Sequence, residues 1–128
     1  MRYLLDTHTF IWFNSEYSKI NSETLKQIQN LSNEVFLSFA SLLEIAIKVS
    51  LNKLNLGLPF NQEFYQSIAD NQIHILPIQF AHLQRLTQLP WHHRDPFDRL
   101  IIAQALEEDL ILISNDSKIK NYSVKTLW

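Results

Sequence analysis

Short apolar runs alternate along this chain with longer segments of helical periodicity. The apolar runs are typical of buried strands and lie at residues 3–5, 34–38, 73–76 and 110–113, with a shorter fifth run between 122 and 127. Helices are expected between them, over about 7–14, 21–31, 40–51, 61–71, 79–88 and 95–108. Strands separated by helices favour parallel pairing through crossover connections. The pattern predicts one domain over residues 1–128: a three-layer α/β/α sandwich around a mostly parallel sheet of four or five strands.

Two of the expected helices carry recognisable start signals. Asp95 followed by Pro96 is typical of an N-cap with proline at the first helical position. Ser41 and Glu44 match a capping box, which predicts that Glu44 lies in the first turn of its helix. The helix over 40–51 is apolar on almost every side, so we expect it to be deeply packed.

Composition excludes several classes of chemistry. The 128 residues include no cysteine, which removes disulfide frameworks, thiol nucleophiles and thiolate-bound metal sites. The single glycine, Gly57, cannot supply a glycine-rich phosphate loop or a dinucleotide-binding turn. A net charge of −2 argues against a broad basic face for nucleic acid. Any contact with a polyanion is therefore expected to be local or to depend on a bound cation.

The same sequence bears on location. No apolar run is long enough to cross a membrane. Asp6 places a charge too early for the apolar core of a signal peptide. We therefore expect a cytoplasmic protein.

Acidic residues gather at one predicted edge of the sheet. Ligands of parallel α/β sheets bind outside the carboxyl ends of the strands, and five of the thirteen acids fall there: Asp6, Glu44, Asp95, Asp98 and Asp116. Two like charges about 4 Å apart repel by roughly 4 kcal/mol at an effective dielectric constant near 20. A hard cation such as Mg²⁺ turns that repulsion into coordination. Their joint placement therefore suggests a metal site.

Each acid also has an ordinary structural explanation. Asp6, Asp95 and Asp116 can cap the helices or turns that follow them. Asp98 suits the positive end of its helix, and Glu44 can pair with Lys48 four residues on. Taken singly, none of the acids identifies a metal site.

The sequence resembles the PIN-domain family, and within it the VapC-type toxins of bacterial toxin–antitoxin pairs. The resemblance covers essentially the whole chain and rests on YLLDTH (3–8), SFASLLEIAIK (38–48), HRDPFDRLIIAQA (93–105) and ISND (113–116). The DPFDR core with its following helix is the most specific of these motifs. The chain departs from the commoner pattern at Ser114, where threonine is more usual.

The resemblance implies a metal-dependent ribonuclease. Asp6, Glu44, Asp98 and Asp116 would be the catalytic residues, and Asp95 would be an auxiliary residue that fixes the start of its helix. Asp6, Asp98 and Asp116 would bind one or two Mg²⁺ or Mn²⁺ ions, while Glu44 would position or deprotonate the attacking water. The resemblance further implies a toxin that forms a homodimer and is blocked by a cognate antitoxin.

Donors and aromatic rings near the expected site are candidates for RNA contact. The candidates are Trp91, which could stack on an unpaired base, and His93, Arg94 and Arg99. Arg99 could instead form an ion pair with Asp95, and the histidines are expected to face solvent. Aromatic residues make up 12% of the chain, and any left exposed on helices would suit a dimer face or a partner helix.

Two other classes of function stay open from the residues alone. A phosphotransfer protein could use Asp6 as a covalent nucleophile, although Asp6-Thr7-His8 offers no second acid two residues on. A non-catalytic binding module could be built on the same sheet, and it would bind no Mn²⁺ in calorimetry.

Overall fold

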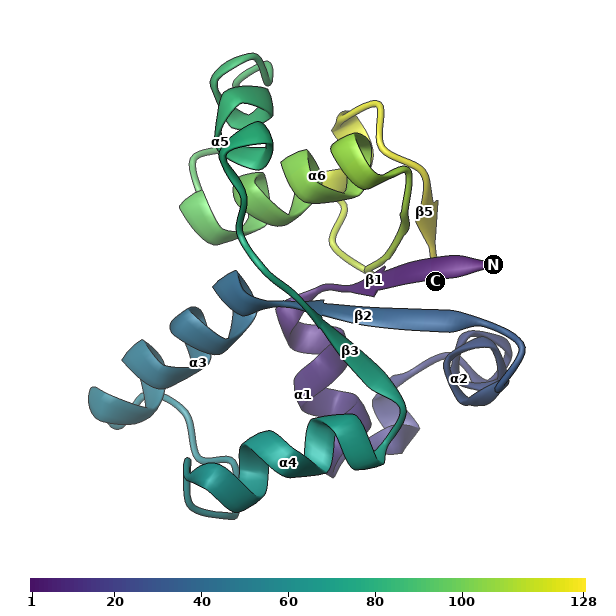
Figure 1. Cartoon of the computed structure of the whole chain (residues 1–128), viewed down its shortest axis with the longest axis vertical. Helices are drawn as coiled ribbons and strands as arrows, with labels where there is room; N and C mark the ends of the chain where they lie inside the picture. Colours follow the sequence, from purple (N-terminus) through teal and green to yellow (C-terminus); the bar gives the residue numbers. More distant parts are fainter.

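The computed structural model describes residues 1–128 and contains a single five-stranded parallel sheet (Figure 1). The strand order is β3-β2-β1-β4-β5, and every ladder is parallel. The strands are β1 (Arg2–Leu5), β2 (Glu34–Ser38), β3 (Ile73–Leu76), β4 (Ile111–Ile113) and β5 (Thr126–Leu127). The predicted α/β sandwich with a parallel sheet is therefore confirmed.

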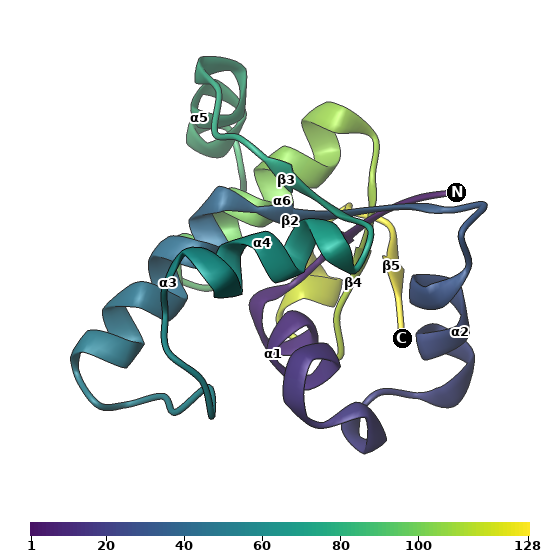
Figure 2. The same ribbon diagram turned by 60° about the horizontal axis from the view of Figure 1, so that its bottom comes forward.

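Helices cover both faces of this sheet (Figures 1 and 2). They are α1 (Thr7–Ser15), α2 (Ser22–Gln29), α3 (Phe39–Ser50), α4 (Gln62–Asp70), α5 (Phe80–Thr87) and α6 (Pro96–Glu108). Two short 3₁₀ helices complete the chain, η1 (Tyr17–Lys19) and η2 (Ile119–Asn121). One apolar core joins the sheet to α1, α2, α3 and α4, and a second joins it to α6 and η2.

The central strand shows how the two cores are divided. Tyr3 and Leu5 of β1 belong to the core beneath α1 and α4, whereas Leu4 belongs to the core beneath α6. Successive side chains of a strand point to opposite faces, so an uninterrupted apolar run is what a strand covered on both faces requires. This arrangement makes β1 the most deeply buried strand and fixes the position of the residue that follows it, Asp6.

The start of α3 differs from the prediction. The Oγ of Ser38 accepts a hydrogen bond from the amide of Ala40 at 3.0 Å, so Ser38 is the N-cap. The capping box predicted for Ser41 and Glu44 is therefore wrong, and Glu44 lies beyond the first turn. Two serines three residues apart can both cap a helix, and only the end of β2 decides between them.

The expected deep burial of α3 is also wrong. Ala40, Leu42 and Ile45 are buried, but Phe39 and Leu43 are about half exposed. The helix packs along one side only and projects from the end of β2 (Figure 1). One apolar face of α3 therefore remains at the surface.

The start of α6 follows the prediction. The carboxylate of Asp95 accepts hydrogen bonds from the amides of Phe97 at 2.9 Å and Asp98 at 3.0 Å. Pro96 occupies the first helical position, where its missing N–H costs nothing. This cap holds Asp98 in the first turn, at the edge of the sheet where β1 and β4 end.

None of the helices combines the length and the apolar character that crossing a lipid bilayer requires.

Candidate active site

Asp6 connects the two central strands at their carboxyl ends. Its amide donates a hydrogen bond to the carbonyl of Ile113, the last residue of β4, at 3.0 Å. Its carboxylate caps α1 by accepting a hydrogen bond from the amide of Thr9 at 2.7 Å. Burial raises the pKa of Asp6 above its ordinary value and outweighs the hydrogen bonds that oppose it. The carboxylate is thus fixed in place but poorly solvated, and a cation beside it would favour its charged form.

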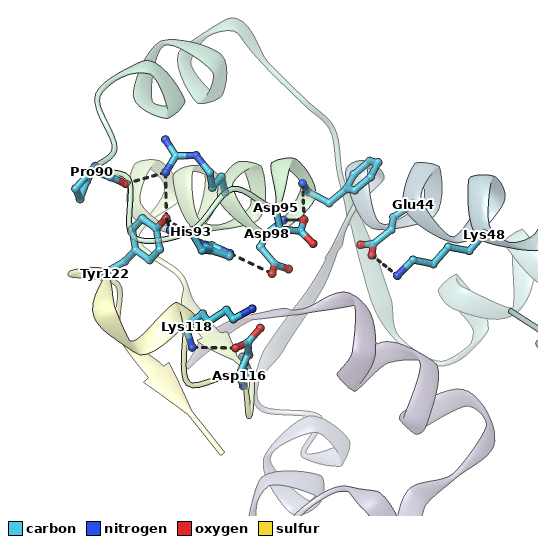
Figure 3. Close-up of polar contacts among 12 residues, drawn as sticks. Glu44, Lys48, Pro90, His93, Asp95, Asp98, Asp116, Lys118 and Tyr122 are labelled. Atoms are coloured by element: carbon cyan, nitrogen blue, oxygen red, sulfur yellow. Dashed lines mark hydrogen bonds and ion pairs between the residues drawn. The ribbon is translucent and has the colours of Figure 1, made fainter. Parts of the chain in front are cut away.

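Asp98 lies among other acids. Burial, followed by the charge of Asp95, raises the pKa of Asp98 from 3.8 to about 6. The charge of Asp116 acts in the same direction, while a hydrogen bond from His93 lowers it. Figure 3 shows Asp98, at the start of α6, and Asp116, after β4, on two sides of the same space.

Asp116 is held by its own turn. Ser114 accepts a hydrogen bond through Oγ from the amide of Asp116 at 3.0 Å, and Asp116 accepts one from the amide of Lys118 at 2.9 Å. Asp6 and Asp116 line one hollow of about 260 Å³ together with His8, Trp12 and Asn115. Strands β1 and β4 therefore bring two of the predicted ligands to one cavity.

Glu44 approaches the same region from α3. Its side chain is buried, and Oε2 accepts a hydrogen bond from Lys48 Nζ at 2.7 Å. Its other oxygen, Oε1, is buried with no hydrogen-bond partner. In Figure 3 the carboxylates of Glu44 and Asp116 both turn toward the space around Asp98. A buried acceptor without a partner is costly, and a nearby cation, or a water that the cation holds, would offset that cost.

The four acids predicted as the catalytic set thus lie around one edge of the sheet but do not touch. As the side chains stand, no group of three or more His, Asp or Glu residues is close enough to form a ready-made metal site. Mutual repulsion keeps like charges apart. The residues nevertheless fit a hard divalent cation, because all the donors are carboxylate oxygens and one of them is buried without a partner.

Arg99 occupies neither of its predicted roles. Its side chain is buried, and Nη1 donates hydrogen bonds to the carbonyl of Pro90 at 2.7 Å and the hydroxyl of Tyr122 at 3.0 Å. Arg99 contacts Asp95 only through its backbone amide, which donates a hydrogen bond to the carbonyl oxygen of Asp95. The alternative ion pair is therefore absent. A guanidinium committed to these internal bonds is not available to an RNA strand.

His93 is likewise not the solvent-facing residue that was expected. Its side chain is 8% exposed, and its ring bonds both to Tyr122 and to Asp98. Trp91, by contrast, is 76% exposed, and the Arg99 guanidinium lies over its ring, with the guanidinium carbon 3.8 Å from the ring centroid. Arg94 is also exposed. Of the four candidates for RNA contact, Trp91 and Arg94 are therefore the accessible ones.

Sequence reasoning missed Tyr122 entirely. The residue lies 23 positions after Arg99 and 29 after His93, and its hydroxyl bonds to both. It reaches them because η2 returns the chain beneath the start of α6, which no local pattern indicates.

Comparisons with known proteins identify the family and the fold of this chain. The family model described as PIN domain matches residues 3–125. No curated protein matches significantly.

Solved structures share the fold over almost the full length of the chain. VapBC2 from Rickettsia felis, bound to a DNA fragment from its promoter, matches with a TM-score of 0.72 at 19% identity, over 99% of this chain and 98% of that one. VapBC-1 from nontypeable Haemophilus influenzae matches with a TM-score of 0.66 at 18% identity, over 99% and 97%. A toxin–antitoxin complex from Klebsiella pneumoniae matches with a TM-score of 0.64 at 17% identity, over 98% and 96%. The arrangement of the strands, the acids at their carboxyl ends and the match of the family model show together that this chain belongs to the PIN domain family.

Proposed function

We propose that this chain is a metal-dependent endoribonuclease, which hydrolyses RNA phosphodiester bonds and acts as the toxin of a toxin–antitoxin pair. One observation carries the proposal: Glu44, Asp98 and Asp116, from three distant segments, turn toward one space, where Glu44 Oε1 is buried without a partner. The local contacts of Glu44 with Lys48 and of Asp116 with its turn do not require the acids to share one space, whereas a phosphate reaction assisted by a cation does. Membership in the PIN domain family supports the same class of chemistry.

Asp6, Asp98 and Asp116 are the residues we assign to hold Mg²⁺ or Mn²⁺. When bound, such an ion activates a water and neutralises charge on the phosphate and on the leaving oxygen. Glu44 is assigned to orient that water or accept its proton, because its buried carboxylate faces the site without a hydrogen bond at Oε1. Asp95 keeps its structural role as the cap that places Asp98.

Trp91 and Arg94 are the residues that we assign to the substrate. One face of the Trp91 indole rests on the Arg99 guanidinium, while most of the side chain is open to solvent. A ring held from behind in this way offers a stacking platform for an unpaired base. The positive charge of Arg94 suits a backbone phosphate. We therefore propose single-stranded or looped RNA as the substrate.

An apolar groove between α3 and the segment leading into α4 is the surface that we assign to the antitoxin. Its volume is about 560 Å³, and the apolar lining residues are Phe39, Leu42, Leu43, Ala46, Phe60 and Tyr65. Helix α3 carries Glu44 on its buried side and Leu43 on its exposed side, so a partner in this groove would lie beside the site. One of the solved structures that share this fold, from Klebsiella pneumoniae, is a toxin–antitoxin complex, which supports such a partner. We also propose a homodimer, which sedimentation of the purified chain would test.

The test of the nuclease is cleavage of a defined RNA panel by Asp98→Asn. The purified wild-type protein is expected to cut RNA with Mg²⁺ or Mn²⁺ and to stop when a chelator is added. Asp98→Asn is expected to lose at least about 100-fold in rate, because it removes one ligand charge while keeping the shape of the side chain. Asp70→Asn, at the exposed end of α4, is the matched control and should cut normally. Cleavage by Asp98→Asn at the wild-type rate would contradict the proposal.

A non-catalytic binding module is the second candidate. The observation that favours it is that the acids form no ready-made metal cluster. Calorimetry with Mn²⁺ separates the two candidates, because a binding module of this kind would take up no ion.

A further inference from the structure

A continuous line of hydrogen bonds runs from the interior of the protein to Asp98 (Figure 3). Arg99 Nη1 lies 3.0 Å from the hydroxyl of Tyr122, and that hydroxyl lies 2.9 Å from His93 Nδ1. The opposite nitrogen of the same ring, Nε2, lies 3.2 Å from Asp98 Oδ2. These residues come from the loop before α6, from α6 itself and from the segment after η2, so folding alone assembles them.

The direction of each hydrogen bond in this line is determined. A guanidinium can only donate, so the oxygen of Tyr122 accepts from Arg99. The backbone amide of His93 also donates to that oxygen, at 3.4 Å. The Asp98 carboxylate can only accept, so Nε2 of the neutral His93 ring donates to Oδ2. Nδ1 is then an acceptor, and the hydrogen of the Tyr122 hydroxyl goes to it.

We propose that His93 is a positioning residue for Asp98, and that Tyr122 and Arg99 fix the ring of His93 in the tautomer this role needs. The hydrogen bond to Oδ2 sets the rotation of the carboxylate, and no hydrogen bond engages Oδ1. Oδ1 is thereby left for the cation. This inference rests on the proposed function, because a carboxylate needs such fixing only if its orientation matters to a ligand.

Geometry separates this role from ordinary packing. The line ends on the carboxylate of Asp98, whose side chain is 20% exposed and can reach water. It does not end on a buried backbone group that would lack a hydrogen bond without it. Two groups determine which nitrogen of His93 bears the proton: the Asp98 carboxylate accepts at Nε2, and the Tyr122 hydroxyl donates at Nδ1. Removal of a partner that orients a metal ligand typically lowers metal affinity 10–100-fold.

The experiment measures Mn²⁺ binding by calorimetry and thermal unfolding in the same samples of His93→Ala, His93→Gln and Tyr122→Phe. The side chain of glutamine carries an acceptor oxygen and a donor nitrogen on one carbon, just as the two ring nitrogens of histidine share one carbon. It can therefore accept from Tyr122 and donate to Asp98. We expect His93→Ala to lose about 10–100-fold in Mn²⁺ affinity, and Tyr122→Phe about 10-fold. His93→Gln should recover most of the loss.

The matched control is His74→Ala, which removes an exposed histidine on β3. It should bind Mn²⁺ as the wild-type protein does. A second readout, the nitrogen chemical shifts of His93 in the metal-free protein above pH 7.5, reports the tautomer without metal or RNA. We expect the proton on Nε2 in the wild-type protein and a larger share of rings protonated on Nδ1 in Tyr122→Phe.

The outcomes are distinguishable. If the wild-type protein binds Mn²⁺ and both His93→Ala and Tyr122→Phe bind it equally well, the positioning role is overturned and the proposed nuclease stands. A proton on Nδ1 in the wild-type protein would also overturn it. If the wild-type protein takes up no Mn²⁺, the proposed function fails, and so does the proposal that His93 positions Asp98 for a cation.

Discussion

Asp98 and Glu44 face the same space, yet the chain holds the two carboxylates in different ways. Asp98 accepts a hydrogen bond from a histidine and lies among other acids, and its pKa is raised to about 6. Glu44 is paired with the cation of Lys48 four residues along α3, and one of its oxygens has no partner. Asp98 is held by His93 from the loop that precedes its helix, and Glu44 by Lys48 of its own helix. The difference suggests separate tasks: Asp98 as a fixed ligand, and Glu44 as a charged group free to act on water.

Among the variants that test this difference between Asp98 and Glu44, Glu44→Gln is expected to have the largest effect, on the rate of RNA cleavage. A general base contributes about 10²–10⁴-fold to the rate, so we expect the kcat of RNA cleavage to fall at least about 100-fold. Mn²⁺ affinity should change only a few-fold, whereas Asp98→Asn should lose both affinity and rate. Calorimetry and initial-rate kinetics on the two variants check this. If Glu44→Gln loses Mn²⁺ binding as strongly as Asp98→Asn, the two acids share one task.

Lys48→Met should lower the free energy of unfolding by about 1–2 kcal/mol in metal-free buffer. The change keeps most of the aliphatic stem but leaves the buried carboxylate of Glu44 without its cation. The effect stays below that of a fully buried pair because Lys48 is 39% exposed. Urea unfolding measures it, with Lys26→Met in the exposed pair with Glu23 as control. Equal stability of Lys48→Met and the wild-type protein would show that Glu44 does not depend on this pair.

A pH dependence of stability is also expected in metal-free buffer. The pKa of Asp98 is about 6 in the folded protein and near its ordinary value of 3.8 when unfolded, so the folded state holds this proton more tightly. Its contribution to stability is therefore full below about pH 4 and is lost as the pH rises through 6. The raised pKa of Asp6 acts in the same direction.

Urea unfolding at pH 4, 5 and 6 tests this dependence. The wild-type protein should lose stability relative to Asp98→Asn as the pH rises, because the asparagine does not titrate. Taking the difference between the two proteins cancels the groups they share. A difference that stays constant across this range would contradict the raised pKa.

The sequence alone predicted the sheet well and the site only in part. The bounds of β2 and β3 follow from apolar runs that end at clear polar or proline signals. The position of Asp6 follows from a general rule, because a residue after a central parallel strand lies where ligands bind. These predictions succeed because they depend on local pattern and on topology.

The failures share a physical reason as well. The start of α3 depends on which of two serines the end of β2 presents to the helix, and both are capable caps. The partners of Arg99 and His93 depend on where Tyr122 lies, which is a matter of tertiary packing. Contacts between segments far apart in sequence leave no periodic signal, so the contacts of Tyr122 with His93 and Arg99 could be found only in the structure.

The most direct test of the central claim is a crystal structure grown with Mn²⁺ and recorded at a wavelength where manganese scatters anomalously. The account predicts an anomalous peak within coordination distance of Asp6, Asp98 and Asp116, with Glu44 turned toward it. An anomalous map without a peak at this edge of the sheet, in a crystal saturated with the ion, would contradict it.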